Sequence, residues 1–180
     1  MKKFIIATVV GGIVLFMWQF LSFAAVNLHS KATTYTPKQD TILQFLSSNL
    51  QEGQYLLPTV PPNSSMDDEQ KLMEAANGKP WASIAYHKSL DTGMTLNLVR
   101  GYIADIAIIA LVVWLLLQFK QRKFLTILLA NIAIGSIAFM NIPYQDYIWY
   151  KTFDINAYLL DAVVGWGLVG LWLGWYLKEK

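Results

Sequence analysis

The chain has 180 residues, of which 55% are hydrophobic and 14% charged, and its formal net charge is +2. A soluble domain of this length does not bury so much apolar material, so part of its surface must face lipid. The sequence has no basic stripe with interleaved aromatic residues, which argues against nucleic acid as a partner, and no cysteine, which excludes disulfides and thiolate metal sites.

Four apolar segments each have close to the roughly 20 residues that a helix needs to cross a bilayer. They are residues 4–26, 98–119, 124–142 and 155–177. A spanning backbone must satisfy its own hydrogen bonds, and these segments lack the alternation of barrel strands. The sequence therefore predicts an all-α integral membrane protein, a bundle of four transmembrane helices. We expect helix 1 in residues 1–26, a small α/β cap in 27–97 and helices 2 to 4 in 98–180.

The first apolar segment also resembles a signal peptide, because two lysines precede it. Its apolar region, residues 4–23, is longer than the about 7 to 15 residues of a signal-peptide core, which favours an uncleaved helix. Basic residues flank the ends of the spans on one side, namely Lys2, Lys3, Lys120, Arg122, Lys123, Lys178 and Lys180. Such ends face the cytoplasm. We expect both termini to be cytoplasmic in a bacterial inner membrane, with residues 27–97 and 143–154 extracytoplasmic.

Two helices are expected in the cap. The first has Thr36 as its N-cap, Pro37 at its first helical position and Gln39 completing a capping box, and it ends at Gly53. The second starts after Ser64 or Ser65, has acidic residues in its first turn and closes at residues 77–78. Its acidic start lacks the spacing of a calcium loop.

The remaining cap residues suggest a small sheet. Residues 81–88 alternate between apolar and polar side chains and are typical of a strand, and residues 54–59 are expected to pair with it. The later segment 141–154 is rich in aromatic residues and is expected to be an external loop along the membrane interface.

Several polar residues inside the spans form a candidate intramembrane site. Counting about 1.5 Å of rise per residue places four of them at a similar depth, roughly 6 Å outward of each helix midpoint. We expect an internal polar layer, with one further residue deeper and one nearer the outer surface. The candidate residues are Gln19, Asp105, Asn131, Ser136, Asp161 and Arg100.

Two interpretations of Asp105 and Asp161 stay open. They are a hydrogen-bonded layer that fixes helix register, or they act as a proton or cation relay or substrate site. Arg100 has Asp154, Asp161 or a lipid phosphate as its candidate partner. His29 and His87 are expected at the surface or interface, because no second ligand with metal-site spacing accompanies either. No metal and no cofactor are predicted.

The fourth span has two distinct faces at about 100° per residue. One face carries Asp154, Tyr158 and Asp161, and the opposite face carries a row of glycines, Gly167, Gly170 and Gly174. Small residues at this spacing let helices approach closely. The glycine face is expected to pack against another span, a second copy of the chain or another membrane protein.

Three classes of function remain. A non-enzymatic accessory or structural envelope protein with an external interaction surface is favoured, and a small proton- or cation-coupled transporter using Asp105 and Asp161 is the alternative. The third class is a membrane-embedded aspartyl hydrolase, since four spans and two outer aspartates resemble lipoprotein signal peptidases in architecture. Their signature motifs are absent around both aspartates, and we expect no catalytic residues.

Overall fold

A computed structural model describes residues 1–179, most of which are helical. The chain forms two compact units: a helical unit, Met1–Thr34 together with the chain from Gly93 onward, and a smaller unit, Tyr35–Thr92. The elements are α1 (Lys2–Phe20), a π-helix (Leu21–Ala25), α2 (Gln39–Asn49), β1 (Gly53–Leu57), α3 (Met66–Ala76), β2 (Ala82–Tyr86), α4 (Met94–Leu117), α5 (Phe124–Asn141), α6 (Pro143–Tyr150) and α7 (Ile155–Leu177).

Four helical segments of the helical unit are long and apolar enough to cross a membrane, which confirms the predicted number of spans. They are Lys2–Ala25, Met94–Leu117, Phe124–Tyr150 and Ile155–Leu177. Even in the last of these, only 39% of the most apolar stretch is buried within the protein. The rest of that apolar surface needs lipid as its surroundings.

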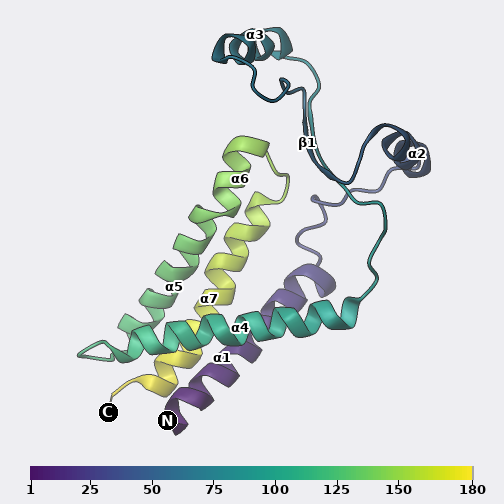
Figure 1. Cartoon of the computed structure of the whole chain (residues 1–180). Helices are drawn as coiled ribbons and strands as arrows, with labels where there is room; N and C mark the ends of the chain where they lie inside the picture. The colour runs from purple at the N-terminus through teal and green to yellow at the C-terminus, as the bar shows by residue number, and fades with distance from the viewer. Residues whose placement is uncertain (180) are drawn as a thin grey trace. The chain divides into compact units, whose positions relative to one another are not determined.

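The helix α7 contacts both α1 and α5, whereas α4 packs mainly on α1 (Figure 1). Glycines allow the close approaches. A Cβ added to Gly11 of α1 would lie 2.8 Å from Ile109 of α4, and one added to Gly135 of α5 would lie 2.5 Å from the carbonyl oxygen of Ala162 in α7. Backbones can approach this closely only where a side chain is missing.

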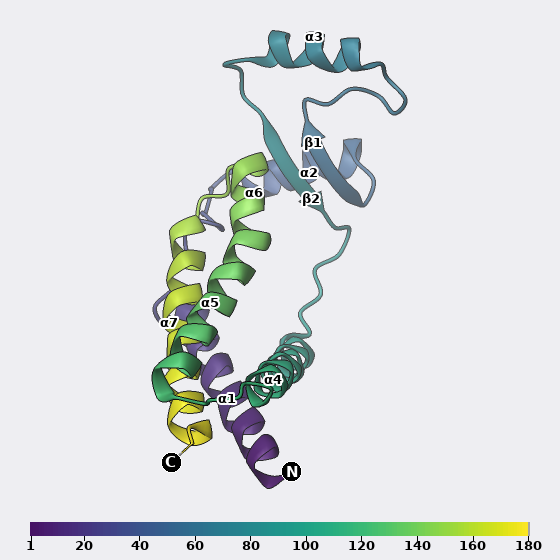
Figure 2. The same cartoon turned by 90° about the vertical axis from the view of Figure 1, so that its left-hand side faces the viewer.

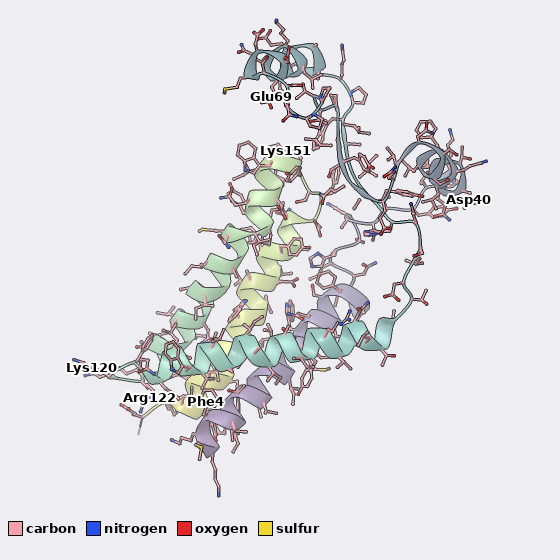
Figure 3. The ribbon with its side chains drawn as sticks, in the orientation of Figure 1. Phe4, Asp40, Glu69, Lys120, Arg122 and Lys151 are labelled. Carbon is pink, nitrogen blue, oxygen red and sulfur yellow. The ribbon has the colours of Figure 1, made fainter. Side chains whose placement is uncertain are left out.

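The buried core lies mainly in the half of the helical unit that holds both termini. The α4–α5 turn, with Lys120 and Arg122, is at the same end (Figure 3). Arg122 forms an ion pair with Glu179, whose backbone N–H donates to the Arg122 carbonyl at 3.0 Å. Basic ends of the spans are thus gathered on one side. The core residues are Ala7, Leu15, Ile109, Val112, Val113, Leu116, Ile127, Val169, Leu173 and Leu177.

The helix α4 crosses α1, and its N-terminal half stands apart from α5 and α7 in both views (Figures 1 and 2). All of its buried residues fall between Asp105 and Leu116. Large apolar side chains of the N-terminal half of α4 are exposed, including Leu98 at 45% and Ile103 at 61%. This half of α4 is therefore a surface for lipid or for another apolar partner.

The segment after α5 is helical, so the prediction of a loop over 141–154 is wrong for residues 143–150. The helix α5 ends at Asn141, and α6 restarts with Pro143 in its first turn. Proline is tolerated there because the first N–H groups of a helix have no intrahelical partner. Lys151, with a left-handed backbone at φ 50°, ends α6.

In the smaller unit, β1 and β2 pair antiparallel with Gly53 opposite Tyr86 and Leu57 opposite Ala82, which confirms the predicted sheet. Ser65, one of the two predicted N-caps, caps α3, and it forms a capping box with Asp68 that was not predicted. The predicted start of α2 is wrong by two residues. Its N-cap is Lys38, and the Thr36 hydroxyl accepts only the Lys38 N–H, at 3.3 Å. Gly53 begins β1 instead of ending α2, which stops at Asn49.

Candidate functional site

Two aspartates lie on one face of α7. Asp154 is the N-cap residue of this helix, and Asp161 follows seven residues later, which is almost two full turns. Residues at this spacing project from the same side of a helix. The side chain of Asp154 is 5% exposed and that of Asp161 16%. Both carboxylates are therefore largely enclosed by the protein and need hydrogen-bond partners within it.

The chain after α1 turns back and brings His29 onto this face. A π-helix, Leu21–Ala25, extends α1, and Asn27 then adopts a left-handed backbone with φ 54°. The Leu28 N–H donates to the Ser22 carbonyl at 2.8 Å, which closes the turn. Asparagine tolerates this backbone region better than most residues. The turn ends with His29 buried, at 5% exposure.

His29 bridges the two carboxylates. Its Nδ1 lies 2.8 Å from Oδ2 of Asp154, and its Nε2 lies 2.9 Å from Oδ2 of Asp161. The ring of Phe23 stacks on the imidazole with centroids 3.8 Å apart, and Tyr158 meets it edge-on at 4.6 Å. The expectation of a surface or interfacial His29 is wrong, because this histidine is enclosed by α7 and the end of the first span.

The proton count of this His29–Asp154–Asp161 triad sets its charge. Each nitrogen–oxygen contact needs one proton between its atoms. Either an imidazolium donates to two carboxylates, or a neutral imidazole donates to one carboxylate and accepts from a carboxylic acid. Both arrangements sum to a net charge of about −1. A further proton on the remaining carboxylate, whose carbonyl oxygen can still accept from the imidazole, makes the triad neutral.

Trp18 of α1 completes the surroundings of Asp161. Its indole N–H donates to Oδ1 of Asp161 at 2.9 Å. Gly165, one turn along α7, leaves the room for this indole, since a Cβ there would lie 2.7 Å from the Trp18 ring. The Trp18 bond and the His29 bridge together fasten the C-terminal end of the first span to α7.

Asp105 is held separately. The amide of the adjacent α1 residue, Gln19, donates to Oδ1 of Asp105 at 3.1 Å, and the second carboxyl oxygen has no hydrogen-bond partner among residues 1–179. Asp105 is 2% exposed. Neighbouring residues of α1 thus bind the two predicted aspartates, Trp18 binding Asp161 and Gln19 binding Asp105.

The remaining predicted polar residues do not join this site. Asn131 donates to the Ile127 carbonyl at 2.8 Å, and Ser136 donates to the Ile132 carbonyl at 2.9 Å, both within α5. Arg100 is exposed on α4 and forms no ion pair with a described carboxylate. Of the six predicted polar residues, the structure thus brings one pair, Gln19 and Asp105, into direct contact.

The glycine row on α7 mostly faces α5. A Cβ on Gly170 would lie 3.0 Å from Asn131, and one on Gly174 would lie 3.0 Å from Phe124. Gly167 has nothing within 4 Å of an added Cβ. Two of the three glycines therefore serve packing within the chain, and Gly167 faces open space.

The three side chains of the triad do not form a metal site. No group of three or more His, Asp or Glu side chains able to hold a metal ion occurs in the described chain. The imidazole lies between the two carboxylates, so their oxygens do not converge on one point.

The sequence could have indicated this site in part, since the helical phase of α7 places Asp154 and Asp161 on one face. No periodicity in the sequence places His29 on this face, because only the turn after the first span brings it next to the two aspartates. The sequence matches no protein-family model, and comparisons with curated proteins and with solved structures found no match.

Proposed function

We propose that the protein is a non-enzymatic, multi-pass component of a bacterial inner membrane that binds another envelope component through its Tyr35–Thr92 unit. The observation that carries this proposal is the apolar side of α2. Ile42, Leu43 and Phe45 are 46%, 54% and 66% exposed, and no residue of α2 is buried. Short helices gain most of their stability from packing of their apolar face, so this face suits a partner.

The expected topology supports an external role for this unit. Positive ends of spans face the cytoplasm, and in this chain the basic α4–α5 turn lies at the end that holds both termini (Figures 1 and 3). With this orientation the chain between α1 and α4 lies outside the membrane. There it is available to envelope components that a cytoplasmic segment does not meet.

The test compares two charge substitutions on opposite sides of α2. Phe45→Glu places a carboxylate on the apolar side, whereas Gln44→Glu places one on the polar side of the same helix. Full-length variants are crosslinked in native membranes, solubilised in mild detergent and purified. We expect a partner crosslinked by the wild type and by Gln44→Glu to be lost with Phe45→Glu. Equal recovery with both variants would overturn the proposal.

A second candidate, a small proton- or cation-coupled transporter, is favoured by the buried triad. Two ring nitrogens between two carboxylates can pass a proton from one side of the imidazole to the other. The test is Asp161→Asn in reconstituted vesicles. If the protein is a transporter, this variant loses proton-linked flux and keeps its fold. If the triad is only structural, the variant loses thermal stability, and the wild type shows no proton-linked flux.

A further inference from the structure

A cleft lies between the first span, α5–α6 and α7, directly beside the triad. Its volume is about 220 Å³, below the range of about 300–1,000 Å³ typical of sites for drug-sized ligands. Aromatic rings make up much of its wall. They belong to Trp18, Phe23, Phe139, Tyr158 and Trp166.

Besides the Tyr158 hydroxyl, which can both donate and accept, two side chains bring acceptor oxygens to this cleft. Asp161 lines it and is the most exposed member of the triad, at 16% against 5% for the other two. Gln19 lines it too, and its amide nitrogen is already used by Asp105, which leaves its carbonyl oxygen as an acceptor. The polar atoms that the cleft offers therefore favour a hydrogen-bond donor as its ligand.

The electrostatics favour a cation. With two protons shared among its three side chains the triad carries a net charge of about −1, and no lysine or arginine of residues 1–179 forms a salt bridge with Asp154 or Asp161. Negative charge inside a membrane bundle is costly unless it is compensated. Aromatic faces attract organic cations as well, and ammonium ligands are commonly bound in this way.

We propose that this cleft binds a small organic ammonium ion with an apolar body. Asp161 and the Gln19 carbonyl face the ammonium group, and the aromatic walls surround the apolar body. The volume restricts the ligand to a small amine. This binding is independent of the interaction proposed for the Tyr35–Thr92 unit.

The test uses 2-phenylethylammonium as the probe and the purified full-length protein in an uncharged detergent. Isothermal titration calorimetry compares it with 2-phenylethanol, which has the same shape without the charge. We expect the ammonium ion to bind at least tenfold more tightly than the alcohol, and Asp161→Asn to remove most of this preference. Equal affinity for the two compounds would overturn the proposal.

A second variant keeps the test decisive if Asp161→Asn fails to fold. Ala138 of α5 lines the cleft and is exposed, so Ala138→Phe fills the cleft without touching the triad. Ala133→Phe is the matched control, an exposed position of α5 outside the cleft. We expect Ala138→Phe to weaken ammonium binding at least tenfold and Ala133→Phe to leave it unchanged. Unchanged binding in Ala138→Phe would show that the probe binds elsewhere.

Discussion

His29 is the side chain that joins the carboxylates of Asp154, which is buried, and Asp161, which is partly buried, so its removal should be costly. His29→Leu keeps an apolar volume beside Phe23 but leaves Asp154 and Asp161 without their shared partner. Removing one member of a buried ionic group typically costs about 3–5 kcal/mol. We expect a loss of this order in the free energy of unfolding, measured by thermal and denaturant unfolding in detergent.

The second histidine supplies the control for this prediction. His87 contacts Glu52 at 3.2 Å, but its side chain is 71% exposed and that of Glu52 is 55% exposed. Exposed ion pairs contribute little to stability. His87→Leu should leave the unfolding transition almost unchanged, and an equal loss in both variants would show that His29 has no special structural role.

Gly165 tests the bond between Trp18 and Asp161. A Cβ at Gly165 would lie 2.7 Å from the Trp18 ring, so Gly165→Ala must displace the indole that donates to Asp161. We expect a loss of about 1–3 kcal/mol, the usual cost of leaving a buried polar group unsatisfied. Gly167→Ala, two residues along α7 and facing open space, should be neutral in the same unfolding measurement.

The sequence predicted one half of the site and missed the other. Helical phase alone places Asp154 and Asp161 on one face of the fourth span, because both residues belong to one regular element. His29 lies on the irregular turn after the π-helix, where no periodicity fixes the direction of a side chain. The bond between Gln19 and Asp105 joins residues 86 positions apart, and only the packing of α1 on α4 decides it.

At the scale of elements, the contact of α5 with α7 depends on Gly135. A Cβ there would lie 2.5 Å from the backbone oxygen of Ala162, and a backbone atom cannot move aside as a side chain can. We expect Gly135→Ala to destabilise the protein by about 1–3 kcal/mol through overpacking. Gly101→Ala in α4, where an added Cβ meets nothing within 4 Å, is the control in the same thermal unfolding assay.

The capping box of α3 gives this helix a dependence on pH. Hydrogen bonds from the Ser65 hydroxyl and then from the Ser65 backbone N–H lower the pKa of Asp68 below its usual value. A carboxyl with a lowered folded-state pKa stabilises the fold above its unfolded pKa, and this contribution is lost as pH falls through the folded pKa. The capping box at the start of α3 should therefore weaken only at pH values below the ordinary pKa of an aspartate.

Carboxyl NMR of the full chain tests this shift. The Asp68 signal should titrate at a lower pH than the ordinary pKa of an aspartate. Ser65→Ala removes the hydroxyl and should move the Asp68 pKa upward. An unchanged titration in Ser65→Ala would contradict the role of the hydroxyl in this cap.

Local signals predicted elements well where one strong feature decides the structure. A serine, Ser64 or Ser65, followed by acidic residues marks the start of α3, and alternation marks β2. The predicted start of α2 is wrong because Pro37 suits a first helical position, whereas the helix begins at Gln39. The helix α6 has no clear signal in the sequence, because Pro143 is as typical of a loop as of a first helical turn.

At the scale of the whole molecule, the number of spans followed from length and hydropathy, but their packing did not. Four apolar helices can be arranged in several ways that satisfy the same composition. The contacts of α7 with α1 and α5 arise from Gly165, Gly135 and Gly170, whose partners lie far away in sequence. Such pairs carry no local signal. The sequence alone therefore predicts that a helix face packs closely, but it does not identify the helix that packs against it.

The orientation of the whole chain in the membrane is testable because it has no cysteine to give background labelling. Figure 3 places Lys151 and Lys120 at opposite ends of the helical unit. If the basic end is cytoplasmic, Lys151→Cys and Lys71→Cys should react with a membrane-impermeant maleimide in intact spheroplasts. Gln121→Cys, exposed in the α4–α5 turn, should react only after the membrane is permeabilised. The reverse pattern would place the Tyr35–Thr92 unit in the cytoplasm and would remove its proposed envelope partner.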